Sequence, residues 1–263
     1  MPCADLVDRS GIVSLNGSVA LVTGAGRGIG RAVALALAEL GVKVAVVARG
    51  REELDRTVEL VRARGGAAVA VVADLGDPSA AAGVVERAVG ELGPVDVLVN
   101  NAATVEPLGP SAGLGPAAWD ALRLNVPTPV ALCSAVLPWM TAAGRGRIVN
   151  VSSGVVSRPA SMIGGNVYVT TKAALEAHTL NLAAELDGTG VTVNVFRPGT
   201  VDTAMQAAIR RTGEGRLDDT TYARFVRNHE EGGLITPEQS ARALVGRMGG
   251  NASGQIWDVS DAA

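Results

Sequence analysis

The 263-residue sequence predicts an α/β fold in which a doubly wound parallel sheet of seven strands is covered by helices on both faces. Short apolar runs rich in Val and Ala alternate with longer, helix-like stretches along most of the chain. These runs show no strict alternation with polar residues, which is typical of parallel strands buried on both faces. Apolar residues form 48% of the sequence and aromatic residues only 3%, so the core must consist mainly of small aliphatic side chains.

The first hundred residues predict strands and helices in turn. An apolar strand at 19–23 leads through a glycine-rich turn into an Ala- and Leu-rich helix at 31–40, which Gly41 ends. The alternation continues with a strand at 42–48, a helix at 51–64, a strand at 67–73, a helix at about 77–92 and a strand at 95–99. This is the order of consecutive βαβ units.

The rest of the chain continues the same alternation. It predicts a helix at about 116–142, a strand at 147–151, a helix at about 166–187, a strand at 191–196, a helix at about 237–249 and a last strand at 254–259. No linker, repeat or low-complexity tract interrupts the pattern. We therefore predict one domain over residues 18–263, preceded by a peripheral N-terminal arm over residues 1–17.

Composition excludes several classes of function. The net charge is −3 and no Lys/Arg cluster occurs, so nucleic-acid binding is not expected. Asp5 and Asp8 lie where a secretion signal needs a basic start and an apolar core, and the apolar segment 129–143 is too short to span a bilayer. Cys3 and Cys133 are too few for a disulfide framework or a metal cage. We expect a cytoplasmic protein without a membrane span or a metal site.

Glycines mark the turn after the first predicted strand. Gly24, Gly28 and Gly30 have the spacing G-x3-G-x-G, which differs from the general dinucleotide pattern G-x-G-x-x-G. Their place between the first strand and the first helix would let backbone N–H groups at a helix N-terminus receive a pyrophosphate. This position in the first βαβ unit favours a dinucleotide loop over a simple turn.

Tyr168 and Lys172 are separated by four positions at the start of a predicted helix, so their side chains share one face of it. A nearby ammonium favours the phenolate and brings the pKa of a phenol, ordinarily about 10, closer to neutral. Ser153, after the strand at 147–151, is in position to hydrogen-bond a substrate oxygen. A pair with this spacing also occurs on exposed helices, so the spacing alone does not establish an active site.

Taken together, the motifs resemble those of the short-chain dehydrogenase/reductase family. They are TGAGRGIG at 23–30, NNAA at 100–103, Asn125, Ser153, Tyr168-x3-Lys172 and PGTVDT at 198–203, and they follow the family's order over residues 15–259. The resemblance implies a Rossmann-type domain that transfers a hydride between a nicotinamide cofactor and a carbonyl or alcohol. Ala103 replaces the usual Gly, and the loop between Ser153 and Tyr168 is longer than usual, but no catalytic group is missing.

The resemblance implies a role for each catalytic residue. Tyr168 would be the general acid and base, and Lys172 would lower its pKa while holding the nicotinamide ribose. Ser153 would orient and polarise the carbonyl, although the neighbouring Ser152 competes for this position. Asn125 would complete the tetrad through a water-mediated proton relay, or it would only satisfy backbone groups inside a buried helix.

The resemblance also implies the cofactor contacts. Asp74 and Leu75 would flank the adenine, although Asp74 is equally suited to capping the turn before the next helix. Val201 and Thr203 would contact the nicotinamide carboxamide. The full predicted set, besides Tyr168 and Lys172, is Gly24, Arg27, Gly28, Ile29, Gly30, Arg49, Asp74, Leu75, Asn101, Ala102, Pro198, Gly199, Val201 and Thr203.

Charge predicts the choice of cofactor. An acidic residue about twenty positions after the glycine loop would bind the adenine ribose hydroxyls and repel a 2′-phosphate. Here the chain has Arg49, and Arg27 lies inside the glycine loop. Guanidinium groups suit a phosphate, so we predict NADP(H) over NAD(H). The alternative is that both arginines are solvated surface charges.

The sequence therefore predicts an NADP-dependent carbonyl reductase acting on a small-molecule carbonyl or alcohol. The segment between Thr203 and Thr236 is expected to cover the substrate pocket, and its balanced Arg and acidic residues indicate no charge preference. We expect a homo-oligomer, a dimer or a tetramer, formed through the helices at 116–142 and 166–187. Two alternatives stay open: a non-catalytic dinucleotide-binding regulator, and an isomerase or dehydratase that retains its nicotinamide.

Overall fold

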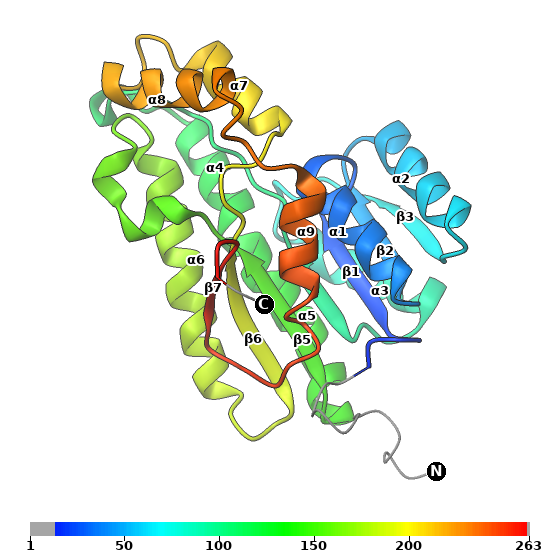
Figure 1. Cartoon of the computed structure of the whole chain (residues 1–263). Helices are drawn as coiled ribbons and strands as arrows, with labels where there is room; N and C mark the ends of the chain where they lie inside the picture. Colours follow the sequence, from blue (N-terminus) through cyan, green and yellow to red (C-terminus); the bar gives the residue numbers. More distant parts are fainter. Residues whose placement is uncertain (1–13, 262–263) are drawn as a thin grey trace.

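The computed structural model describes residues 14–261 and contains a seven-stranded sheet in which every neighbouring pair of strands is parallel (Figure 1). The strand order is β3-β2-β1-β4-β5-β6-β7, which confirms the predicted doubly wound fold. Of the predicted arm over 1–17, residues 1–13 lie outside the described residues. The strands are β1 Val19–Thr23, β2 Lys43–Ala48, β3 Ala68–Val72, β4 Val97–Asn100, β5 Gly146–Val151, β6 Val191–Arg197 and β7 Ile256–Asp258.

Helices cover both faces of the sheet because side chains alternate along each strand. In β1, Ala20 and Val22 join one hydrophobic core with α1, α2 and α9, whereas Val19 and Leu21 join a second core with α3, α5 and α6. All five residues of β1 are buried, which explains why its sequence shows no polar alternation. The helices are α1 Gly28–Glu39, α2 Arg51–Ala63, α3 Ala80–Leu92, α5 Pro127–Ala143, α6 Asn166–Glu185 and α9 Pro237–Val245.

The long helix predicted over 116–142 is divided in two, and this part of the prediction is wrong. A first helix, α4, spans Ala117–Asn125, and α5 begins at Pro127. Val126 lies between them with φ −128° and ψ −70°. A residue before proline avoids regular helical geometry, and proline has no N–H to continue the helical hydrogen bonds. The break places Asn125 at a helix end.

One stretch of the described chain, Ala117–Ala143, is long and apolar enough by length and composition to cross a membrane, with a mean hydropathy of 1.3. A buried core helix meets the same criterion, and Leu132, Val136 and Met140 of this stretch lie in the second core. The break at Val126 also divides the stretch into helices of 9 and 17 residues. It is therefore weak evidence for a membrane span.

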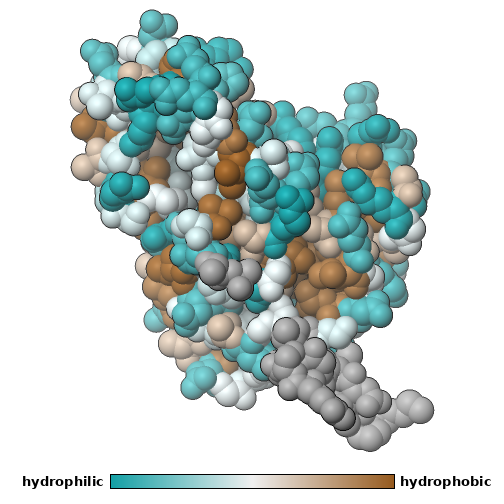
Figure 2. All heavy atoms as spheres, in the orientation of Figure 1, coloured by the Kyte–Doolittle hydropathy of each residue, from teal (hydrophilic) through white to brown (hydrophobic). Residues whose placement is uncertain are grey.

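The segment between Thr203 and Thr236, for which the sequence predicted no element, forms two helices. These are α7, Ala204–Thr212, and α8, Asp219–Glu230. Residues of both helices pack into a third hydrophobic cluster made of Val105, Leu108, Met162, Tyr168, Ile209, Leu217 and Phe225. The outer surface of this layer, at the upper left of Figure 2, is mostly hydrophilic. The inner side of the α7–α8 layer belongs to the same cluster as Tyr168.

Candidate active site

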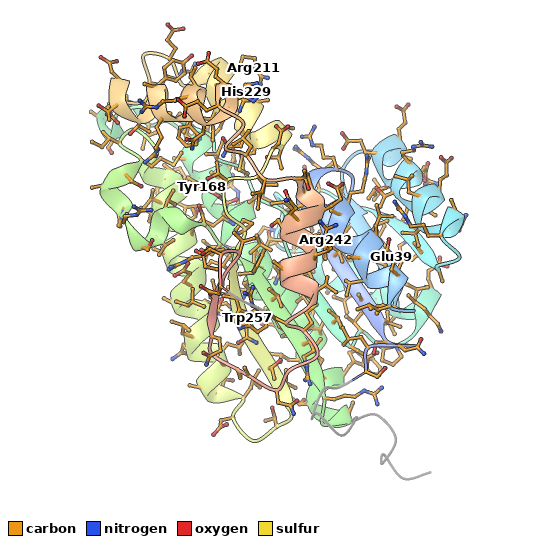
Figure 3. The ribbon with its side chains drawn as sticks, in the orientation of Figure 1. Glu39, Tyr168, Arg211, His229, Arg242 and Trp257 are labelled. Carbon is orange, nitrogen blue, oxygen red and sulfur yellow. The ribbon has the colours of Figure 1, made fainter. Side chains whose placement is uncertain are left out.

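The predicted site residues follow the carboxyl ends of strands β1 to β6 or lie on α4 and α6. The chain extends to one side of β1 through β2 and β3, and to the other side from β4 onward. Ligands of doubly wound sheets bind outside the carboxyl ends of the strands at such a switch point. Figure 3 shows Tyr168, in the first turn of α6, below the α7–α8 layer.

The glycine loop joins β1 to α1, which begins at Gly28, three residues earlier than predicted. Gly24 and Gly28 have φ of 64° and 55°, a region that side chains disfavour. At Gly30 a Cβ would lie 2.4 Å from the carbonyl oxygen of Gly24 and 2.6 Å from Nδ2 of Asn101. No side chain caps the start of α1, so its first N–H groups are available to an anion. The loop therefore fits a pyrophosphate.

Thr23 fixes the NNAA segment against β1. Its Oγ1 accepts hydrogen bonds from the backbone N–H groups of Asn101 (2.9 Å) and Ala102 (3.0 Å). Nδ2 of Asn101 donates in return to the Thr23 carbonyl at 2.9 Å. These bonds place Asn101 and Ala102 beside the glycine loop. Their predicted contact with the cofactor stays a prediction. The sequence motifs assign Thr23 itself no role.

Arg31 and Thr57 hold the glycine loop in place, and neither was predicted from the sequence. Nε of Arg31 donates to Oγ1 of Thr57 at 3.1 Å, and its terminal nitrogen donates to the carbonyl of Gly26. Oγ1 of Thr57 lies 3.0 Å from the carbonyl oxygen of Ala25, to which it donates. Ile29, a predicted cofactor contact, packs against the first core. No local sequence pattern reveals the contacts of Thr57 with Arg31 and Ala25, because Thr57 lies on α2.

Arg27 and Arg49, the predicted ligands of a 2′-phosphate, are both solvent-exposed. Arg27 forms an ion pair with Glu53, in which the nitrogen–oxygen distance is 3.5 Å and the side chains are 66% and 45% exposed. Exposed pairs of this kind contribute little free energy, so a phosphate could replace Glu53 as the partner of Arg27. Both guanidinium groups are accessible to a ligand, but no contact in the structure assigns either of them to one.

Asp74 and Leu75 follow β3 and differ in their surroundings. Oδ1 of Asp74 accepts from the backbone N–H of Gly76 at 2.9 Å, which is the turn-capping role considered from the sequence. Leu75 is only 4% exposed, and its carbonyl accepts from Oγ1 of Thr128 at 2.6 Å. The predicted contact of these residues with adenine stays a prediction.

The two adjacent serines after β5 have different partners. Ser152 is 2% exposed, and its hydroxyl donates to Glu176 at 2.7 Å. Ser153 is partly exposed, and its Oγ accepts from the backbone N–H of Val155 at 3.4 Å. The side chain of Ser153 also acts to lower the pKa of the Tyr168 phenol. The hydroxyl of Ser152 is taken up by Glu176, which leaves Ser153 as the serine available to act with Tyr168.

Tyr168 lies in the first turn of α6 and is 8% exposed. Burial raises the pKa of its phenol, and the side chain of Ser153 acts in the opposite direction. From the sequence, the ammonium of Lys172 was expected to lower this pKa. In the structure burial outweighs any such effect, and Nζ of Lys172 lies 5.8 Å from the centre of the Tyr168 ring. Without a ligand the phenol is therefore protonated at neutral pH.

Lys172 is buried, with 3% of its surface exposed. Its Nζ donates to the carbonyl of Val151 at 2.7 Å, which ties α6 to the end of β5. Burial lowers the pKa of Lys172 to about 8, while the carboxylate of Glu176 acts to raise it. An ammonium has three N–H donors, so two remain after the bond to Val151.

Asn125 ends α4 and links it to two other segments. Its Oδ1 accepts from the backbone N–H of Thr104 at 2.9 Å, and its Nδ2 donates to the Thr104 carbonyl at 2.8 Å and to Oγ1 of Thr171 at 3.1 Å. The side chain satisfies backbone groups of Thr104, which is the alternative to a catalytic role considered from the sequence. Pro129 lacks the N–H that would bind the carbonyl of Asn125 in a regular helix.

The segment after β6 approaches the glycine loop from the other side. Gly199 has φ 78°, and the carbonyl of Pro198 accepts from Oγ of Ser240 at 3.1 Å. Val201 is 3% exposed and pairs with the strand-like residue Ile235. A Cβ on Gly28 would lie 3.4 Å from Cγ2 of Thr203, so Thr203 borders the loop.

Residues 18–214 match the family model described as short chain dehydrogenase. The chain belongs to this family. Short-chain reductase protein NovJ of Streptomyces niveus is 38% identical to this short-chain dehydrogenase over 230 residues, which are 87% of the chain and 86% of the relative. A short chain dehydrogenase of Pseudocercospora fijiensis is 38% identical over 202 residues, which are 73% of the chain and 62% of the relative.

Solved structures agree with the fold of this short-chain dehydrogenase. A putative gluconate 5-dehydrogenase from Beutenbergia cavernae with bound NADP has a TM-score of 0.81 and 33% identity, covering 94% of this chain and 96% of its own. An NAD⁺-bound xylitol dehydrogenase has a TM-score of 0.83 and 26% identity, covering 93% and 98%. Both cofactors therefore occur among structures similar to this short-chain dehydrogenase.

Proposed function

We propose that this short-chain dehydrogenase is an NADP(H)-dependent oxidoreductase of the carbonyl reductase type. The observation that carries the proposal is the convergence of Ser153, Tyr168 and Lys172 at the switch point of the sheet, beside a glycine loop that fits a pyrophosphate. Tyr168 and Lys172 are almost fully buried, so a carbonyl would meet its proton donor away from bulk water.

Tyr168 acts as the general acid of reduction and as the general base of the reverse oxidation. Its raised pKa keeps the phenol protonated at neutral pH, which suits proton donation to a forming alkoxide. Ser153 orients the carbonyl oxygen: its Oγ accepts from Val155, so its hydroxyl proton is free for the substrate. A bound nicotinamide supplies or accepts the hydride.

Lys172 and Asn125 support proton transfer in this proposal. The two N–H donors of Lys172 that Val151 leaves free are suited to ribose hydroxyls. Its ammonium also stabilises the phenolate of Tyr168 during alcohol oxidation. Because Pro129 has no N–H, the carbonyl of Asn125 is free to hold a water molecule. We propose that this water returns a proton to the amine of Lys172 after its ammonium has given one up towards the phenolate of Tyr168.

NADP(H) is the proposed cofactor, over NAD(H). Arg49 stands where NAD-binding sites of this fold carry an acidic residue, and Arg27 lies in the glycine loop. Both are exposed, and the only ion pair that holds Arg27 within residues 14–261 is the weak one with Glu53. NADP in the similar structure from Beutenbergia cavernae is consistent with this choice, whereas NAD⁺ in xylitol dehydrogenase is not.

Assembly and location are also part of the proposal. We expect a dimer or tetramer formed through α4, α5 and α6, where Trp139 is 51% exposed and Leu180 is 38% exposed. Exposed apolar side chains on long helices suit an interface between copies of a chain. A cytoplasmic location is consistent with a sequence of only two cysteines, which suits a reducing compartment.

The test follows NADPH absorbance with a panel of ketones, diketones and aldehydes, and repeats each reaction with NADH. The proposal expects oxidation of NADPH with at least one carbonyl and a higher kcat/KM than with NADH. Tight NADPH binding without turnover of any carbonyl would support the regulatory alternative instead. Product formation without net NADPH consumption would support an isomerase or dehydratase.

A further inference from the structure

A buried carboxylate lies one helical turn beyond Lys172. Glu176 is 5% exposed, and three donors surround its carboxylate. Arg197 donates from Nε to Oε1 at 2.9 Å and from its terminal nitrogen to Oε2 at 2.7 Å. The hydroxyl of Ser152 donates to Oε1 at 2.7 Å. This is a two-point guanidinium–carboxylate pair, the strongest geometry for such an interaction.

The three partners come from the three segments that carry the proposed chemistry. Ser152 directly precedes Ser153 at the end of β5, and Arg197 directly precedes Pro198 at the end of β6. Glu176 lies on α6, together with Tyr168 and Lys172. Its carboxylate therefore joins the serine segment, the catalytic helix and the segment expected to meet the nicotinamide.

Stability alone is a poor reason for such a pair. Burying two charges costs desolvation free energy, and apolar residues of similar size often replace a buried pair without loss of stability. The pair does, however, place a carboxylate at i+4 from Lys172 on the same face of the helix. Besides Arg197, a second buried cation, Lys172, therefore has the carboxylate of Glu176 as a nearby negative charge.

The charged and titratable groups around Lys172 lie on α6, β6 and β7. On α6 it is flanked by Tyr168 and Glu176, and Arg197 on β6 faces Glu176 from the opposite side. The negative charge of Asp258 on β7 acts to raise the pKa of Arg197. Burial disfavours the ammonium of Lys172, and Glu176 is the acid that opposes this effect.

We propose that Glu176 is a positioning residue of the active site: held by Arg197 and Ser152, its carboxylate keeps Lys172 charged and fixes the serine segment against α6. This inference rests on the proposed role of Lys172 as a cationic partner of Tyr168. It adds a requirement to that role, since the charge of the ammonium then depends on the carboxylate of Glu176.

The test measures the charge of Lys172 directly. The chain contains two lysines, Lys43 and Lys172, so protein labelled with ¹³C at the lysine ε-carbon gives two signals, which Lys43→Arg assigns. NMR titration of Glu176→Gln should show the pKa of Lys172 about one unit lower than in the wild type. The exposed Lys43, at the start of β2, is the internal reference and should not change.

A second variant predicts a shift of opposite sign. Arg197→Gln frees the carboxylate of Glu176 and removes a positive charge, so the pKa of Lys172 should rise. Glu185→Gln, at the exposed end of the same helix, is the matched control and should change nothing. Opposite shifts cannot arise from general loosening of the site, and Arg197→Gln still tests the proposal if Glu176→Gln fails to fold.

No shift in either variant, or shifts of the same sign, would overturn the inference. Because the titration needs no turnover, it succeeds or fails separately from the proposed reductase activity. An activity measurement completes the test: at pH values above the altered pKa of Lys172, Glu176→Gln should lose kcat relative to the wild type, and the difference should diminish as the pH is lowered. A loss of the same size at every pH would indicate a purely structural role.

Discussion

Replacing Asn125 by Ala tests how the break between α4 and α5 supports the site. The amide of Asn125 makes three hydrogen bonds, two with the backbone of Thr104 and one with Oγ1 of Thr171. Asn125 is 1% exposed, so water cannot readily replace the lost bonds. At about 1 kcal/mol of net free energy for each bond, the variant should be about 3 kcal/mol less stable. For a domain of this size that corresponds to a fall in Tm of roughly 6–12 °C.

Thermal unfolding followed by circular dichroism, with and without NADPH, measures this effect. Asn166→Ala, at the exposed first position of α6, is the control and should stay within about 0.5 kcal/mol of the wild type. Because the hydroxyl of Thr171 also donates to the carbonyl of Tyr168 at 2.8 Å, kcat of Asn125→Ala should fall as well. A Tm within about 2 °C of the wild type would refute the reasoning that this amide joins α4 to the catalytic helix.

Three further variants test the other parts of the site. Arg49→Asp should reverse the cofactor preference, because a carboxylate repels a 2′-phosphate and accepts from ribose hydroxyls; an unchanged ratio of kcat/KM for NADPH and NADH would remove Arg49 from the account. Ser153→Ala should lower kcat about 100-fold and Ser152→Ala less than tenfold, whereas equal losses would contradict the choice of serine. Gly30→Ala should abolish NADPH binding in a calorimetric titration, since its Cβ would lie 2.4 Å from a carbonyl oxygen, whereas Gly83→Ala, with nothing within 4 Å, should bind normally.

Local sequence patterns were sufficient to predict the sheet, the glycine turn after β1 and the helix that carries Tyr168 and Lys172. The apolar run of β1, the glycines after it and the four-residue spacing of Tyr168 and Lys172 are properties of neighbouring residues, and each predicted its structure. The helix at about 77–92 begins only at Ala80, because the carboxylate of Asp77 accepts from the N–H of Ser79 and forms a turn first.

Other features depend on contacts between distant residues. Helices α7 and α8 are short, and they are stabilised by packing on the cluster around Tyr168 rather than by a long amphipathic repeat. The pair of Glu176 and Arg197 and the bond from Ser152 join three separate elements. The sequence shows each residue but not its partner. The break at Val126 could have been predicted from the sequence, because Pro127 follows it directly.

The most direct test of the central claim compares Tyr168→Phe with Tyr222→Phe, which alters the only other tyrosine in the chain. Single-turnover oxidation of NADPH is followed with each variant at matched cofactor occupancy. Loss of the general acid should slow the reaction of Tyr168→Phe by about 10²–10⁴-fold while NADPH binding persists, and Tyr222→Phe should react at close to the wild-type rate. If Tyr168→Phe oxidises NADPH as fast as the wild type, the phenol is not the proton donor and the proposed mechanism is wrong.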